Sequence, residues 1–170
     1  SPDVGDELRL VKRIVAEPGD TIEMVNGRLL INGRESGYER FEPDERLMQY
    51  FTRQTGSIKR ASEFDFFNET VEADDNAPGD QHAVMFEDEK PSIRAFPPIT
   101  VPEGEYVMIG DNRDNSKDSR AWNMSEAEFG TKLGFIGHER IHGRAFAVAF
   151  SLDKKRYYLP RWSRFFKGID

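Results

Sequence analysis

Two Asn-Gly pairs constrain the fold of this chain more than any other feature of the sequence. Asn26-Gly27 separates two short apolar runs, 22–25 and 28–31, and Asn32-Gly33 ends the second run. Asn and Gly tolerate the positive φ angles of a type I′ turn, whose twist matches that of two paired strands. The sequence therefore predicts a β-hairpin here, as part of an antiparallel sheet.

Other elements follow from the alternation of apolar and polar side chains. We expect further strands at 7–15, 81–86, 106–109 and 144–152. Pro18-Gly19 fits the two central positions of a type II turn. Short helices are predicted at 44–54 and at 123–133, where Ser125 and Glu128 form a capping-box pattern. The predicted fold is mostly β, with antiparallel sheets and one or two short helices.

The character of the chain changes between residues 36 and 98. This region is charged and aromatic, and its hydrophobic periodicity is weak. A chain of 170 residues is long enough for one hydrophobic core with a small additional unit. We interpret 36–98 as an inserted small subdomain, and 1–35 together with 99–170 as the β core.

Composition excludes several classes of function. The net charge of −7 argues against a general nucleic-acid-binding protein. The chain has no cysteine, so no disulfide supports the fold. No stretch approaches 18 apolar residues, the length that a membrane-spanning helix needs. The chain starts at Ser1 rather than Met, from which we expect a processed, truncated or engineered N-terminus.

The loop from Gly110 to Arg120 contains no large apolar side chain. A loop this polar is ordered only when its charged groups satisfy one another. One interpretation is a solvated surface turn. A second is a calcium loop, although the Gly and Glu positions of an EF-hand are missing and interleaved cations would repel Ca²⁺. A third is a scaffold of internal ion pairs that holds a side chain beside a reactive group.

Lys12 is the residue of this sequence with the sharpest chemical alternatives. Period two in the strand 7–15 places it on one face with Leu8, Leu10 and Ile14. A charge on an inward face can protect an edge strand against aggregation, and strand geometry alone favours this role. Burial among apolar side chains can instead lower a lysine pKa by roughly 3–5 units, which would give a general base at neutral pH.

A competing motif is His138-Glu139-Arg140-Ile141-His142, which matches the His-Glu-X-X-His pattern of zinc metallopeptidases. In that chemistry two histidines one helical turn apart bind zinc and the glutamate activates water. The motif needs a helix, yet glycines bracket it and a predicted strand follows at once. His82 is the remaining histidine, and no third ligand is identified.

Three segments together resemble one known family, the type I signal peptidases. The loop at 110–120 is similar to the family's C-terminal signature box. Residues 11–20 resemble its Lys-Arg-Val-Val-Gly-Leu-Pro-Gly-Asp box, and Gly143-Arg144-Ala145 with Ser151-Leu152-Asp153 resembles its closing strand. The matches come in the family's order and span most of the chain, which is more specific than one short motif.

The resemblance implies a serine endopeptidase that removes signal peptides from exported preproteins with a Ser–Lys dyad, without a metal or other cofactor. It implies antiparallel sheets of the signal-peptidase type. Lys12 falls at the position of the catalytic lysine, which reverses the preference stated above, and Ser116 falls where a hydroxyl orients that amine. The resemblance gives structural roles at the site to Arg13, Asp111, Asn112, Arg113, Asp118 and Arg120, with Asp118 paired to Arg113 or Arg120.

The family's nucleophile is a serine in a Ser-X-X-Pro-Thr box after a membrane span, and no such box occurs in these residues. We expect the nucleophile in a segment upstream of Ser1, and we expect these residues alone to cleave peptides poorly. The resemblance implies a location at the outer face of the cytoplasmic membrane, with preprotein signal peptides and the membrane surface as partners. Departures from the family pattern at Ala16-Glu17, Ala121 and 123–133 bear on the substrate groove.

Two further alternatives stay open at this stage. The basic and aromatic tail, 154–167, fits either docking on the core or contact with anionic lipid. A non-catalytic relative that binds extended peptides by adding a strand to its sheet is a hypothesis from another functional class.

Overall fold

The computed structural model describes residues 9–44, 63–71, 79–88, 90–122 and 130–145, together with short strands between 147 and 168. Several predictions concern residues outside this set. They include Leu8, most of the predicted helix at 44–54, the capping box of Ser125 and Glu128, and most of the tail at 154–167.

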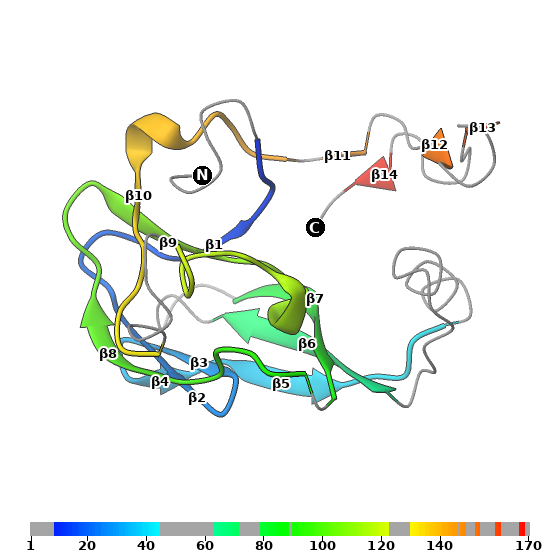
Figure 1. Cartoon of the computed structure of the whole chain (residues 1–170), viewed down its shortest axis with the longest axis horizontal. Coiled ribbons are helices and arrows are strands. Elements are labelled where there is room, and N and C mark those ends of the chain that lie inside the picture. The colour runs from blue at the N-terminus through cyan, green and yellow to red at the C-terminus, as the bar shows by residue number, and fades with distance from the viewer. Residues whose placement is uncertain are drawn as a thin grey trace.

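Strands dominate the described part of the chain (Figure 1). In chain order they are β1 (Arg13–Ala16), β2 (Thr21–Val25), β3 (Arg28–Ile31), β4 (Arg34–Glu35), β5 (Gly37–Arg40), β6 (Phe64–Val71), β7 (Asp80–Glu87), β8 (Phe96–Thr100), β9 (Glu105–Ile109), β10 (Ile136–Gly137), β11 (Ala147–Val148), β12 (Leu152–Asp153), β13 (Leu159–Pro160) and β14 (Lys167–Gly168). The 3-10 helices η2 (Arg113–Asn115) and η4 (His138–Arg140) lie in the same described part of the chain. The strands β1 to β14 pair antiparallel. The prediction of a mostly β fold with antiparallel sheets is therefore confirmed.

The turn predictions are confirmed. Asn26 and Gly27 have φ angles of 51° and 84° between β2 and β3, and Asn32 and Gly33 have 52° and 80° between β3 and β4. The amide of Asp20 donates to the carbonyl of Glu17 at 3.1 Å, and Gly19 has a φ of 89°. These are the positive φ angles that type I′ and type II turns require.

Two sheets enclose the main core. One has the order β4-β3-β2-β8 and the other has the order β1-β9-β10. Their buried apolar side chains form a single cluster, to which β1, β2, β3, β8 and β9 all contribute. The cluster consists of Val15, Ala16, Ile22, Met24, Leu29, Ile31, Phe96, Val101, Val107, Ile109 and Leu133. This core fixes the end of β9, where the polar loop begins.

A third sheet, in the order β5-β6-β7, is built from residues between 37 and 87. It has its own small apolar cluster of Phe64, Phe66 and Met85, with Phe41 packed against it. β8 follows it and pairs with β2 of the main core. The division of the chain into a core and an insertion at 36–98 stays a prediction.

The start of β1 differs from the sequence-based prediction. The strand begins at Arg13, and residues 9–12 before it lie outside any strand. Leu10 and Ile14 are each 40% exposed, whereas the consecutive residues Val15 and Ala16 are buried. The pairing with β9 is irregular between Ile14 and Ala16, which breaks the simple alternation of faces. The face that the sequence assigns to Leu10, Lys12 and Ile14 is therefore not a buried, inward one.

Of the remaining strand predictions, two are confirmed and one is wrong about where the strand begins. Those at 81–86 and 106–109 are confirmed by β7 and β9. The strand expected from residue 144 does not start there, since Arg144 and Ala145 lie outside strands and the paired residues are those of β11 and β12. Within the described residues, no helix has the length and apolar character needed to cross a membrane.

Candidate active site

The polar loop leaves β9 at Gly110 and passes through η2 before it turns back along the same strand. Its charged side chains are mostly inside the protein: Arg113, Asp114, Asp118 and Arg120 are all buried. The amide of Ser119 donates to the carbonyl of Met108, and the hydroxyl of Ser119 accepts from the amide of Met108. The interpretation as a solvated surface turn was wrong, because these charged groups are buried and paired with other groups of the protein.

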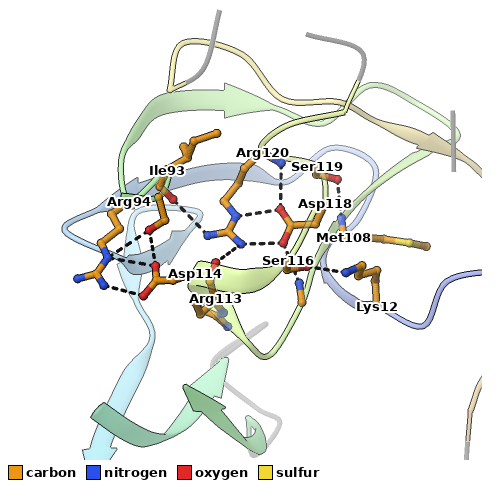
Figure 2. Close-up of polar contacts among 12 residues, drawn as sticks. Lys12, Ile93, Arg94, Met108, Arg113, Asp114, Ser116, Asp118, Ser119 and Arg120 are labelled. Carbon is orange, nitrogen blue, oxygen red and sulfur yellow. Dashed lines mark hydrogen bonds and ion pairs between the residues drawn. The ribbon is translucent and has the colours of Figure 1, made fainter. Parts of the chain in front are cut away.

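Asp118 and Arg120 form the centre of the loop (Figure 2). Arg120 donates to both carboxylate oxygens, from Nε at 2.8 Å and from Nη2 at 2.7 Å. Asp118 Oδ2 also accepts from the amide of Gly110 at 3.0 Å. Burial alone would raise the pKa of Asp118, but the hydrogen bonds and charge of Arg120 hold it below its usual range, with added hydrogen bonds from Gly110 and Ser116.

A second ion pair fixes the loop to the segment that precedes β8. Arg94 Nη2 donates to Asp114 Oδ2 at 2.6 Å, and the amide of Glu87 donates to the same oxygen at 2.8 Å. The hydroxyl of Ser92 donates to Asp114 Oδ1. Asp114 thus accepts from the end of β7 and from two residues of the segment before β8.

Lys12 meets the loop at Ser116. Its Nζ donates to the Ser116 hydroxyl oxygen at 2.5 Å, across 104 positions of sequence. Ser116 in turn donates to Asp118, so amine, hydroxyl and carboxylate form a chain. A Cβ at Gly110 would lie 2.2 Å from Ser116 Oγ and 3.3 Å from Lys12 Nζ, so only glycine permits this approach.

The Lys12 amine is partly buried, and its protonated form is penalised. Loss of hydration lowers the pKa of Lys12 below its usual value. The nearby charges act in both directions, since Asp118 and Asp111 raise this pKa and Arg120 lowers it. Among the described residues no carboxylate forms an ion pair with the amine. The arrangement can present a neutral amine nearer to neutral pH than a free lysine would.

The other predicted support residues lie around this chain. Arg13 forms a two-point ion pair with Asp111, from Nε to Oδ1 at 3.0 Å and from Nη2 to Oδ2 at 3.2 Å, at an exposed position. Asn112 forms a parallel bridge with Met85 of β7, whose amide donates to the carbonyl of Asp111 at 2.9 Å. Asp118 pairs with Arg120, which settles the choice of partner that the sequence left open.

Arg113 has a partner that sequence reasoning missed. Its guanidinium forms a bidentate pair with Glu69 of β6, and both side chains are at most 1% exposed. Tyr38 and His82 contact the same carboxylate. Period two places Glu69 on one face of β6 with Asp65, Phe67 and Val71, so alternation alone did not single it out as the partner of Arg113.

The zinc interpretation does not survive the local geometry. His138 begins the single 3-10 turn η4, which ends at Arg140, and Ile141 is extended with φ −87° and ψ 105°. The α-helical turn that would bring His138 and His142 to one metal is therefore missing. In the part of the chain that the structure describes, no three histidine, cysteine or carboxylate side chains gather as metal ligands. The zinc hypothesis was wrong.

Fold and site together define a β protein with a partly buried lysine amine against a serine hydroxyl, a combination suited to a serine peptidase with a lysine base. The comparison with protein families agrees, because the model of signal peptidases, peptidase S26, matches residues 1–150. The chain belongs to this family.

Individual proteins similar to this chain are named signal peptidases as well. Signal peptidase I of Pseudomonas aeruginosa is 33% identical over 92% of this chain and 49% of its own length. Signal peptidase I S of Bacillus subtilis is 34% identical over 89% of this chain and 58% of its own length. The protein of Aquifex aeolicus is 28% identical over 85% and 58%, respectively. The chain thus spans about half the length of the relatives it matches.

Proposed function

We propose that this chain forms the larger part of the catalytic domain of a type I signal peptidase, an endopeptidase that removes signal peptides from exported preproteins. The observation that carries the proposal is the Lys12 amine, which lies 2.5 Å from the Ser116 hydroxyl and has no ion-paired carboxylate among the described residues. A paired lysine would stay protonated, whereas this environment lowers the pKa of the amine.

In this proposal Lys12 is the general base and the nucleophile is a serine from a segment upstream of Ser1. The neutral amine takes the hydroxyl proton while the oxygen attacks the scissile carbonyl. The amine then returns the proton to the leaving nitrogen, which leaves an acyl ester on the nucleophile. In the second half of the cycle a water molecule gives a proton to Lys12 and attacks the ester. The protonated amine passes that proton to the serine oxygen as the acid is released, so the amine and the hydroxyl both end the cycle in their starting state.

Ser116 orients the amine in this scheme. Since its hydroxyl donates to Asp118, its oxygen lone pairs face Lys12 and accept one amine hydrogen. The free lone pair of a neutral amine is then aimed elsewhere, at the position that the nucleophile would occupy. Asp118 and Arg120 hold Ser116 in place, and Arg13 with Asp111 fixes the chain beside Lys12.

We propose a location at the outer face of the cytoplasmic membrane, where signal peptides emerge. The apolar side chains next to Lys12 support it, because Leu10 and Ile14 are each 40% exposed and Val11 is 79% exposed. Exposed apolar groups beside a catalytic amine suit an apolar peptide substrate or the acyl region of a bilayer.

The decisive experiment is Lys12→Met in this chain extended by its upstream segment, assayed by cleavage of a preprotein. We expect at least about a 10³-fold fall in kcat/KM, since a missing general base typically costs 10²–10⁴. The matched control is Lys117→Met, which removes an exposed lysine one residue from Ser116 and is expected to leave cleavage near wild type. Cleavage retained in Lys12→Met would refute the dyad, and an extended wild type that only binds peptides would favour the non-catalytic alternative.

A further inference from the structure

The most deeply buried ion pair of the described residues lies outside the Lys12–Ser116 site. Arg113 Nη1 donates to Glu69 Oε1 at 2.8 Å, and Nη2 donates to Oε2. Glu69 belongs to β6 in the sheet β5-β6-β7, whereas Arg113 belongs to η2 of the signature loop. The pair therefore ties the loop to a different sheet from the one that leads into it.

Glu69 is itself held rigidly. The hydroxyl of Tyr38 in β5 donates to Oε1 and accepts from the amide of Leu29 at 3.0 Å, which links the carboxylate to β3 of the main core. His82 Nε2 in β7 lies 2.9 Å from Oε2. A carboxylate that two other side chains contact is a firm anchor for the Arg113 guanidinium, whose planar fork matches it at two points.

A continuous path of hydrogen bonds runs from this anchor to the amine. The carbonyl of Arg113 accepts from Arg120 Nη2 at 2.6 Å, and the same nitrogen donates to Asp118 Oδ2 at 2.7 Å (Figure 2). Asp118 holds Ser116 and the amide of Gly110, and Ser116 accepts from Lys12. The position of the Arg113 backbone thus decides where Arg120, Asp118 and Ser116 lie.

We propose that Glu69 is a positioning residue for the Lys12–Ser116 pair, acting through Arg113 and Arg120. The sheet β5-β6-β7 would then contribute directly to the geometry of the reaction site. β7 adds to this support, because the amides of Met85 and Glu87 donate to Asp111 and Asp114 of the same loop. The catalytic meaning of this inference rests on the proposed function, but the geometric claim about Lys12 does not.

The test is the titration of Lys12 in the chain as it stands, followed by NMR with labelled lysine. In Glu69→Gln the loop loses its anchor, water reaches the amine more readily, and the pKa of Lys12 rises. We expect the neutral fraction of Lys12 at pH 8 to fall at least about threefold. The matched control is Asp65→Asn, which removes a carboxylate from the same strand, where it pairs at 2.8 Å with the exposed Arg40, and should leave Lys12 unchanged.

The double variant Glu69→Gln/Arg113→Met distinguishes a positioning role of Glu69 from a role in stability alone, because it leaves neither side chain of the pair charged. If Glu69 positions the site, stability returns but the pKa of Lys12 stays raised. A wild-type pKa of Lys12 in a folded Glu69→Gln, or in the double variant, would overturn the proposal. The proposed function is judged separately, since loss of cleavage in Lys12→Met tests the base whatever Glu69 does.

Discussion

Lys12 and Arg113 are two cations at the same loop, and the structure treats them in opposite ways. Arg113 is fully buried against Glu69, and although burial alone would lower its pKa, the carboxylate raises it above the usual value. Lys12 is only partly buried, has a hydroxyl as its partner, and its pKa is lowered. The more buried cation is thus the more firmly charged one.

The difference shows that the partner, rather than depth, decides whether a cation near this loop is structural or chemical. A bidentate carboxylate compensates for lost hydration and keeps a guanidinium charged. A hydroxyl orients an amine but brings no negative charge to compensate the ammonium form. Partial burial is therefore enough to shift the amine toward its neutral form. The four predictions below test this contrast.

Arg113→Met should have the largest effect. It leaves Glu69 buried without its cation, and breaking one side of a buried pair typically costs about 3–5 kcal/mol of unfolding free energy. Urea denaturation at pH 7 measures the loss, and Glu69→Gln/Arg113→Met should recover more than half of it. If the single variant is as stable as wild type, the pair does not support the loop.

Acid should weaken the same pair. Burial would raise the pKa of Glu69, but His82, Arg113 and Tyr38 lower it to about 2 from 4.5. Because the folded pKa is depressed, its contribution is complete above pH 4.5 and is lost as pH falls from there through 2. We expect roughly 3 kcal/mol of acid-dependent stability in wild type that is missing from Glu69→Gln. Denaturation curves between pH 6 and 2 give the answer, and equal acid slopes in the two proteins would contradict it.

Lys12→Met should change stability by less than about 1 kcal/mol at pH 7, because no ion pair among the described residues is broken. The lowered pKa of Lys12 predicts instead that the stability of the wild type depends on pH. Burial of the protonated amine disfavours the folded state at neutral pH. Between the lowered pKa of the folded protein and 10.5, the unfolded chain holds more protons than the folded one, so wild-type stability should rise with pH in this range, and the variant should lack that rise. Thermal unfolding from pH 7 to 10.5 tests this, and a rise preserved in the variant would assign it to another group.

Arg13→Gln should have the smallest effect. The pair with Asp111 has the same two-point geometry as Arg113 with Glu69, but it is exposed to solvent. Exposed pairs contribute about 0.2–1 kcal/mol, and salt screens them. Urea denaturation at low and high ionic strength should show a small loss that disappears in salt. A loss as large as that of Arg113→Met would mean that geometry matters more here than burial.

Local chemistry made the turns predictable. Asn26-Gly27, Asn32-Gly33 and Pro18-Gly19 specify their backbone conformations from one or two residues, and all three were confirmed. The position of Lys12 opposite Ser116 was also anticipated, but through resemblance to a family rather than from spacing. Alternation did not predict the face that β1 buries. The register of β1 against β9 shifts between Ile14 and Ala16, and this shift depends on the partner strand as well as on the residues of β1.

The sequence by itself determined the hairpins, the mostly β class and the set of charges in the signature loop. Only the tertiary structure decided that Arg113 receives a carboxylate and Lys12 a hydroxyl. Glu69 reaches Arg113 across 44 positions and Lys12 reaches Ser116 across 104. A pKa depends on the groups within a few ångströms in space, and neighbours so far apart in the chain are set by how sheets pack, which no local pattern of residues records.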